Sequence, residues 1–124
     1  KGYTFVKEQY PILINNTTYH CDLVFYHRIL KCFVLIDLKV NAVKHLDIGQ
    51  MNMYMGYFSE EVNELDDNPP IGIVLARDKD ELLVKYATYG MDKNLFVSKY
   101  ELYLPDKEEL QKLVDNILTE EDLE

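Results

Sequence analysis

Two neighbouring apolar segments constrain what this chain can fold into. Residues 19–27 and 31–40 are rich in Val, Ile, Leu, Phe and Tyr, so each is expected to form a β-strand. The link between them is short, which predicts an antiparallel hairpin. Each segment also carries an acid among its apolar residues, Asp22 in the first and Asp37 in the second.

The expected register of this hairpin brings the two acids together. If Arg28 faces Lys31 across the turn, Asp22 lies directly opposite Asp37. Opposed side chains on one face of a sheet have Cβ atoms roughly 4.5–5.5 Å apart. Lys39 lies two residues beyond Asp37 and shares its face, because side chains alternate along a strand.

Two carboxylates at this separation favour a cation between them. At about 5 Å and an effective dielectric of about 20 they repel by roughly 3 kcal/mol, which one lysine offsets in part. A divalent cation offsets more, and hard oxygen ligands suit Mg²⁺ or Mn²⁺. Two alternatives stay open: the charges are those of a solvated sheet face, or a longer turn at residues 29–30 shifts the register and moves Asp22 to the other face.

A helix is expected directly after the second acidic strand. Apolar residues recur at steps of three and four over residues 46–65: Ile48, Met51, Met55, Phe58, Val62 and Leu65. Gln50 and Tyr54 are four apart and share one face of this helix, toward the strand end that carries Asp37 and Lys39. The alternative is that Tyr54 is a core aromatic and Gln50 a solvated residue.

These residues carry a resemblance to a known family. Asp22, then Asp37-Leu38-Lys39, then Gln50-x-x-x-Tyr54 resembles the PD-(D/E)XK nuclease superfamily, in the variant with a RecB-type Q-x-x-x-Y motif. The blocks F-V-K-E-Q-Y-P-I, D-L-V-F-Y-H-R, L-I-D-L-K, G-Q-M-N-M-Y and N-P-P-I-G-I-V-L, with the later L-P, are similar to the bacterial YhcG-type nuclease domain. This resemblance runs from about residue 2 to about residue 105.

The resemblance implies roles for the acids and the lysine. Asp22 and Asp37 would ligate a Mg²⁺ or Mn²⁺ ion, with the Leu38 carbonyl as a further ligand. Lys39 would be the catalytic lysine. The family usually has Glu where this chain has Asp37, and the superfamily motif allows either acid.

The resemblance also implies roles for the helix. Gln50 and Tyr54 would support the site or the substrate phosphate. In the first strand the family often has Arg where this chain has Glu8, which either removes a phosphate contact or adds an acid that faces the metal.

The implied activity is that of a divalent-metal-dependent nuclease that hydrolyses phosphodiester bonds of nucleic acid, with DNA as the expected substrate. The alternative is a catalytically silent domain of the same fold that serves nucleic-acid binding or dimerisation. The implied fold is a restriction-endonuclease-like α/β core with a mixed sheet flanked by helices. Because the chain begins at Lys1, we expect a fragment that lacks the N-terminal core helix, whose parent chain has an N-terminal domain that assists binding.

The order of elements along the chain predicts a single α/β domain over residues 1–124. Strands are expected at residues 3–8 with 10–14, 19–27, 31–40, 71–76 and 95–103, and helices at 46–65, 78–89 and 106–118. A strand remains the alternative for part of 78–89. The core spans about 2–105, and 106–124 form an acidic helix and tail.

Net charge bears on the expected partner. The chain carries a formal charge of −9, which argues against a nucleic-acid binder. Residues 101–124, however, hold 9 acids and 2 bases, so residues 1–100 are near neutrality at −2. The acidity of the tail is expected to be that of a solvated helix.

Cysteine usage and apolar content complete the expectations. Cys21 and Cys32 should both point away from the acids, as buried reduced thiols of a cytoplasmic protein. No apolar run reaches the length of a membrane span, so no membrane partner is expected. A homodimer is expected through apolar surface left uncovered on so short a chain.

Overall fold

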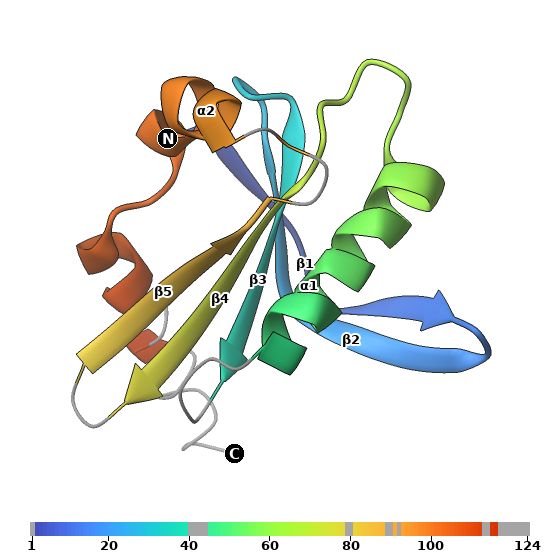
Figure 1. Ribbon diagram of the computed structural model, residues 1–124, viewed down its shortest axis with the longest axis horizontal. Helices are drawn as coiled ribbons and strands as arrows, with labels where there is room; N and C mark the ends of the chain where they lie inside the picture. The colour runs from blue at the N-terminus through green and yellow to red at the C-terminus, as the bar shows by residue number, and fades with distance from the viewer. Residues whose placement is uncertain are drawn as a thin grey trace.

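The computed structural model describes residues 2–39, 45–78, 81–88, 91, 93–112 and 115–116. They form a five-stranded sheet in the order β1-β2-β3-β4-β5 with helical segments on both faces (Figure 1). The strands are β1 (Tyr3–Ile14), β2 (Thr17–His27), β3 (Cys32–Lys39), β4 (Ile71–Asp78) and β5 (Glu81–Ala87). Neighbouring strands are antiparallel except β3 and β4, which are parallel. The sheet is therefore mixed, and the expected α/β class is confirmed.

The β2–β3 hairpin has the register expected from the sequence. Leu23 pairs with Ile36, and the ladder continues from there toward the turn in the predicted alignment. The turn spans residues 28–31 and is longer than two residues, yet it preserves the alignment. One step beyond the Leu23–Ile36 pair, the same alignment sets Asp22 beside Asp37.

A helical crossover joins the two parallel strands, as a parallel pair requires. Helix α1 (His45–Tyr57) continues as a π-helical turn, η1 (Phe58–Val62), so the helix predicted over 46–65 is confirmed with an earlier end. Three residues of its predicted apolar stripe are fully buried: Met51, Met55 and Phe58. Leu65 lies beyond the helix and is fully exposed, so its predicted place in the stripe is wrong.

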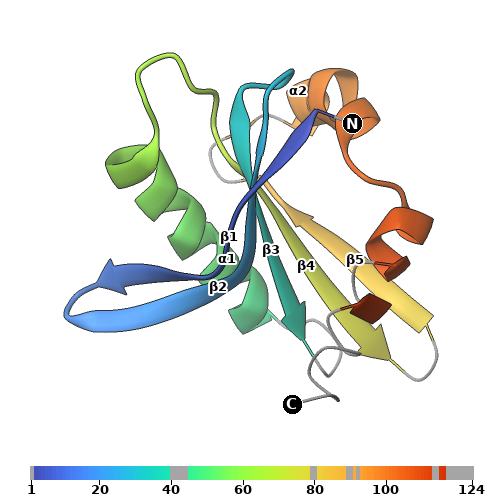
Figure 2. The ribbon, with the colours of Figure 1, turned by 180° about the vertical axis from the view of Figure 1, so that it is seen from behind.

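The sheet has a packed layer on each face (Figures 1 and 2). On one face α1 and η1 cover Val24, Leu35 and Val74. On the other face residues of the C-terminal part cover Val34, Ile36 and Ile73. These covering residues are Phe96, Tyr100, Leu104 and Leu110, all of them helical except Leu104. The faces are separate because successive residues of β3 alternate between the two layers.

Two predicted elements of the second half are wrong. Within the range 78–89, where a helix was expected, residues 81–87 form strand β5, the alternative left open for part of this range. Pairing with the edge of β4 satisfies its main-chain groups and outweighs local helix preference. The strand expected over 95–103 is helical: α2 (Lys93–Leu95), η2 (Phe96–Tyr100) and η3 (Glu101–Tyr103). Phe96 and Tyr100 are four apart, so a helix buries both on one side. Of the helix expected over 106–118, residues 107–112 and 115–116 are helical, Asp106 precedes the helix, and residues 113–114 and 117–118 lie outside the described residues.

Strand β1 forms one edge of the sheet. It is continuous across Pro11, where two shorter pieces were expected, with an irregularity between Phe5 and Lys7. Proline is tolerated there because an edge strand has main-chain groups that need no second partner strand. Phe5, Val6 and Leu13 are exposed on this strand, and the expected homodimer stays a prediction.

Two glycines test how tightly α1 packs on the sheet. A Cβ at Gly72 in β4 would clash with Cγ of the buried Met51, whereas a Cβ at Gly49 in α1 would meet no described atom within 4 Å. Gly72→Ala should therefore destabilise the fold by about 1–3 kcal/mol through overpacking. Gly49→Ala, the matched control, should stabilise it by about 0.5–1 kcal/mol because it removes backbone freedom within a helix. Urea denaturation of both variants measures these changes, and a neutral Gly72→Ala would contradict the packing described.

Candidate active site

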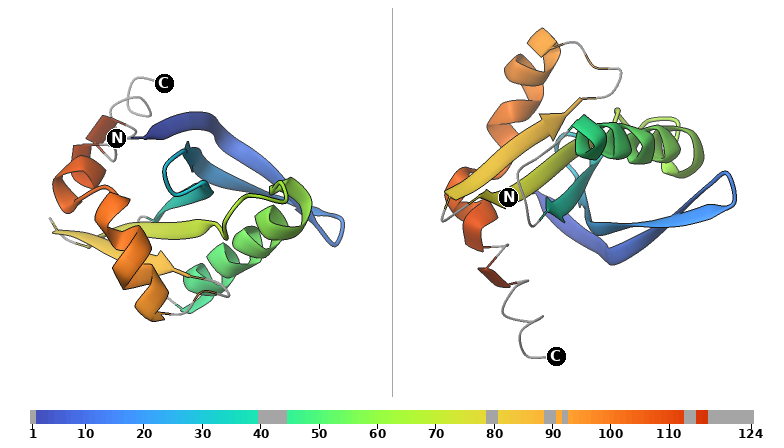
Figure 3. Two further views of the ribbon diagram at one scale, coloured as in Figure 1. Left: turned by 90° about the horizontal axis from the view of Figure 1, so that it is seen from above. Right: turned by 60° about the horizontal axis from the view of Figure 1, so that its bottom comes forward.

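Strand β2 leaves β3 at the position of the two acids. Pairing of β2 with β3 stops at the Leu23–Ile36 pair, whereas β2 remains paired with β1 as far as Thr17 opposite Ile14. The far end of the β1–β2 hairpin therefore extends away from the other strands (Figure 3). We call the point just beyond the Leu23–Ile36 pair the fork.

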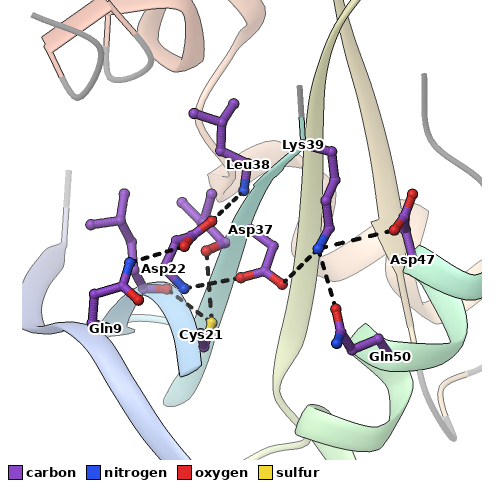
Figure 4. Close-up of polar contacts among 10 residues, drawn as sticks. Gln9, Cys21, Asp22, Asp37, Leu38, Lys39, Asp47 and Gln50 are labelled. Carbon is purple, nitrogen blue, oxygen red and sulfur yellow. Dashed lines mark hydrogen bonds and ion pairs between the residues drawn. The ribbon is translucent and has the colours of Figure 1, made fainter. Parts of the chain in front are cut away.

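At the fork, carboxylates take the place of main-chain acceptors. The Asp22 N–H donates to Asp37 Oδ1 over 2.9 Å, and the Leu38 N–H donates to Asp22 Oδ2 over 2.8 Å (Figure 4). Each acid is thus bound to the main chain of the opposite strand. Asp37 is buried, with 4% of its surface exposed, and Asp22 is half-buried. The structure brings these two expected residues together, and the main chain of Leu38 contacts Asp22.

A residue of β1 that the sequence analysis missed completes the contacts of Asp22. Gln9 Nε2 donates to Asp22 Oδ1 over 3.0 Å. Gln9 has a φ of 49°, which turns the strand locally. A glutamine rarely adopts a positive φ, so the sequence does not predict this turn. Glu8, whose role was left open, is exposed on β1 opposite Leu23.

Lys39 reaches from the end of β3 to the first turns of α1. Its Nζ lies 3.2 Å from Gln50 Oε1, 3.9 Å from Asp37 Oδ2 and 4.0 Å from Asp47 Oδ1 (Figure 4). The contacts with Asp37 and Gln50 join three of the expected residues. Asp47 was not singled out, although it lies three residues before Gln50 and so on the same face of the helix. That spacing was the available signal.

Tyr54 lies on α1 as expected, one turn beyond Gln50, but inside the packed layer. It is buried, and its ring centroid lies 6.1 Å from that of Tyr19. Burial, then the charge of Asp37, raises the pKa of the Tyr54 hydroxyl above its ordinary value. Tyr54 is therefore a protonated core aromatic close to the acids, which agrees with the structural alternative considered for it.

The predicted orientation of Cys21 is wrong. Cys21 packs with Val24 and Leu35 in the layer beneath α1, because the alternation of side chains along β2 breaks at the fork. Its Sγ lies 3.5 Å from the Leu23 carbonyl oxygen, and burial followed by the charge of Asp37 raises the pKa of the thiol. Cys32 lies on the other face as expected, and both thiols are buried and free.

The electrostatics of Asp37 are set by opposing influences. Burial raises the pKa of this carboxyl, the hydrogen bond from the Asp22 N–H lowers it, the Asp22 charge raises it and Lys39 lowers it, with a net rise. A buried carboxylate that resists ionisation gains from any cation beside it.

Within the part of the chain that the structure describes, no group of three or more His, Cys, Asp and Glu side chains surrounds one point. The acids at the fork are therefore a pair. None of the described helices is long and apolar enough to cross a membrane.

The chain resembles known proteins over most of its length. Residues 1–115 match the family model described as the YhcG PDDEXK nuclease domain. Over 108 residues, 87% of the chain, it is 39% identical to "Putative nuclease YhcG" of Escherichia coli (strain K12), and it spans 29% of the length of that relative. A solved structure titled "Crystal structure of SSO0001" aligns with 77% of this chain and 44% of its own, at 18% identity and a TM-score of 0.38. From the family model and the relative, the chain belongs to the YhcG PDDEXK nuclease domain family.

Proposed function

We propose that this chain is the nuclease domain of a divalent-metal-dependent enzyme that hydrolyses phosphodiester bonds of DNA. The observation that carries the proposal is the fork, where Asp22 and Asp37 bind each other's strands and Lys39 lies beside Asp37. Family membership supports a nucleic acid as the substrate. DNA as the substrate, the divalent metal and the roles of the residues are parts of this proposal that go beyond family membership.

The residues at the fork fit a hard divalent cation. Asp22 and Asp37 supply carboxylate oxygens and Leu38 a main-chain carbonyl, the donor types that Mg²⁺ and Mn²⁺ prefer. Mg²⁺ typically takes one or two carboxylates and keeps several waters, which suits an acid pair. The raised pKa of Asp37 agrees with this, because a bound cation would favour the ionised acid that burial disfavours. Such an ion would polarise a phosphate oxygen and lower the pKa of a bound water.

The residues around the acids supply the remaining chemistry. The Lys39 ammonium would orient the attacking water or stabilise charge that develops on the scissile phosphate. Gln50 accepts a hydrogen bond of 3.2 Å from that ammonium, and this bond orients the Lys39 side chain. Tyr54, packed in the layer beneath α1, would hold the helix that carries Gln50 in place. In this proposal Gln50 and Tyr54 support the site and Lys39 acts on substrate.

Attraction of the substrate is proposed to come largely from outside these residues. Residues 1–100 have no excess of positive charge, since they carry a net charge of −2. Phosphate binding depends on several Lys and Arg contacts. Because the chain spans 29% of its relative, other parts of a longer protein have room to supply those contacts.

Removing Lys39 should separate catalysis from metal binding. Lys39→Ala should lower cleavage by about 10²–10³-fold, the loss expected for one electrostatic contact to the transition state. Its Mn²⁺ affinity should stay unchanged or tighten, because a competing cation is gone. Asp37→Asn should lose both cleavage and Mn²⁺ binding.

The measurement combines calorimetry with Mn²⁺ and cleavage assays on the full-length parent protein, using duplex and single-stranded DNA and RNA. Lys99→Ala is the matched control, because Lys99 is an exposed lysine of η2 outside the fork. A Lys39→Ala protein that cleaves as well as the parent would contradict the mechanism. Mn²⁺ binding without cleavage of any substrate would support the catalytically silent alternative.

Asp37 should make the stability of the metal-free protein depend on pH. Burial raises its folded-state pKa above the roughly 3.9 of an unfolded aspartate, so the folded state binds more protons across that interval. The free energy of unfolding should therefore fall as the pH rises from about 4 through the folded-state pKa of Asp37. Asp37→Asn should fall less over the same range. Urea denaturation of both proteins in chelator, between pH 3.5 and 8, measures the difference, and parallel curves would count against it.

A further inference from the structure

The ammonium of Lys39 has an anionic partner outside the expected site residues. Asp47 Oδ1 lies 4.0 Å from Lys39 Nζ, against 3.9 Å for Asp37 Oδ2, so the lysine lies between one acid of its own strand and one acid of α1 (Figure 4). Gln50 supplies the third contact and the one at hydrogen-bond distance. An ammonium has three donors, and these three oxygens come from different residues.

The helix fixes Asp47 where it can act on the lysine. Asp47 and Gln50 are three residues apart in α1 and share one face. The side chains of Lys39 and Asp47 are 28% and 22% exposed, so their attraction is screened by water less than that of a fully exposed pair. Both distances to acids exceed those of hydrogen bonds, which leaves the ammonium free to turn toward a substrate.

The two acids beside Lys39 differ in what happens to them when a divalent cation binds. In the proposed function Asp37 binds that cation, which offsets its charge and repels the ammonium. Gln50 is neutral and can orient Lys39 without balancing its charge. Asp47 then remains as the anionic partner of Lys39.

We propose that Asp47 is a positioning residue that keeps Lys39 beside the acid pair once Asp37 has bound a divalent cation. This inference rests on the proposed function and concerns a residue outside the family motif. It predicts that Asp47 acts on the metal only through Lys39. In the absence of Asp47, the ammonium turns to Asp37 and competes with the cation.

A double-mutant cycle on this chain tests the coupling. Asp47→Asn should weaken Mn²⁺ affinity in calorimetry by about three- to tenfold when Lys39 is present, a size typical of directly coupled charges. With Lys39→Ala, the same substitution should change the affinity by less than about twofold. Asp47→Glu should restore the Mn²⁺ affinity of the unsubstituted chain. Glu60→Gln, which removes an exposed acid from η1, is the matched control and should leave it unchanged.

A second measurement needs no metal. The ¹⁵N-ammonium resonance of Lys39 should be sharp in the metal-free unsubstituted chain and in Glu60→Gln, because the protons of a held ammonium exchange slowly with water. It should shift in Asp47→Asn, where the ammonium turns to Asp37, and return to its original position in Asp47→Glu. A loss of helix stability alone would not produce this pattern in a folded variant.

The outcomes separate the two levels of the proposal. Equal weakening of Mn²⁺ affinity with and without Lys39 would show that Asp47 itself binds the metal and would overturn its positioning role. An unchanged affinity and an unchanged ammonium resonance in Asp47→Asn would also overturn it. Absence of Mn²⁺ binding in the unsubstituted chain would contradict the proposed function instead. The ammonium resonance would still decide whether Asp47 holds Lys39.

Discussion

The reciprocal hydrogen bonds between Asp22 and Asp37 and the opposite strands are the constraint on which the site depends. Buried main-chain N–H groups need acceptors, and where β2 and β3 part, the carboxylates provide them. The same contacts hold two negative charges together in a half-buried place. The far end of the β1–β2 hairpin can therefore part from β3 while the two acids stay bound at the fork, and Gln9 of β1 adds a further contact to Asp22.

The second constraint is the crossover between the parallel strands β3 and β4. It brings α1 onto the face of the sheet that carries Asp37, with Met51 against Gly72. This close packing, which leaves no room for a side chain at position 72 of β4, fixes the first turns of the helix beside the end of β3. Lys39 can then reach Gln50 and Asp47, so the helix and the strand each contribute charges to one place.

The sequence predicted the parts of the fold in which local pattern and long-range pairing agree. The alignment of Asp22 with Asp37 followed from a short turn between the two strands, and the helix that carries Gln50 followed from helical spacing. The prediction failed where pairing overrides local preference, as in β5, and where a helix buries Phe96 and Tyr100.

Near the site, the missed features depend on backbone irregularities. Cys21 lies on the face beneath α1, whereas strict alternation along β2 would place it on the opposite face. The alternation breaks because β2 bends where its pairing with β3 ends. Gln9 reaches Asp22 from a left-handed backbone conformation that cannot be predicted from a glutamine in the sequence.

The central claim, that the fork binds a divalent cation, is tested most directly by anomalous diffraction from crystals grown with Mn²⁺. The account predicts a peak at bonding distance from carboxylate oxygens of both Asp22 and Asp37. A protein saturated with Mn²⁺ whose peaks all lie away from these two acids would contradict it.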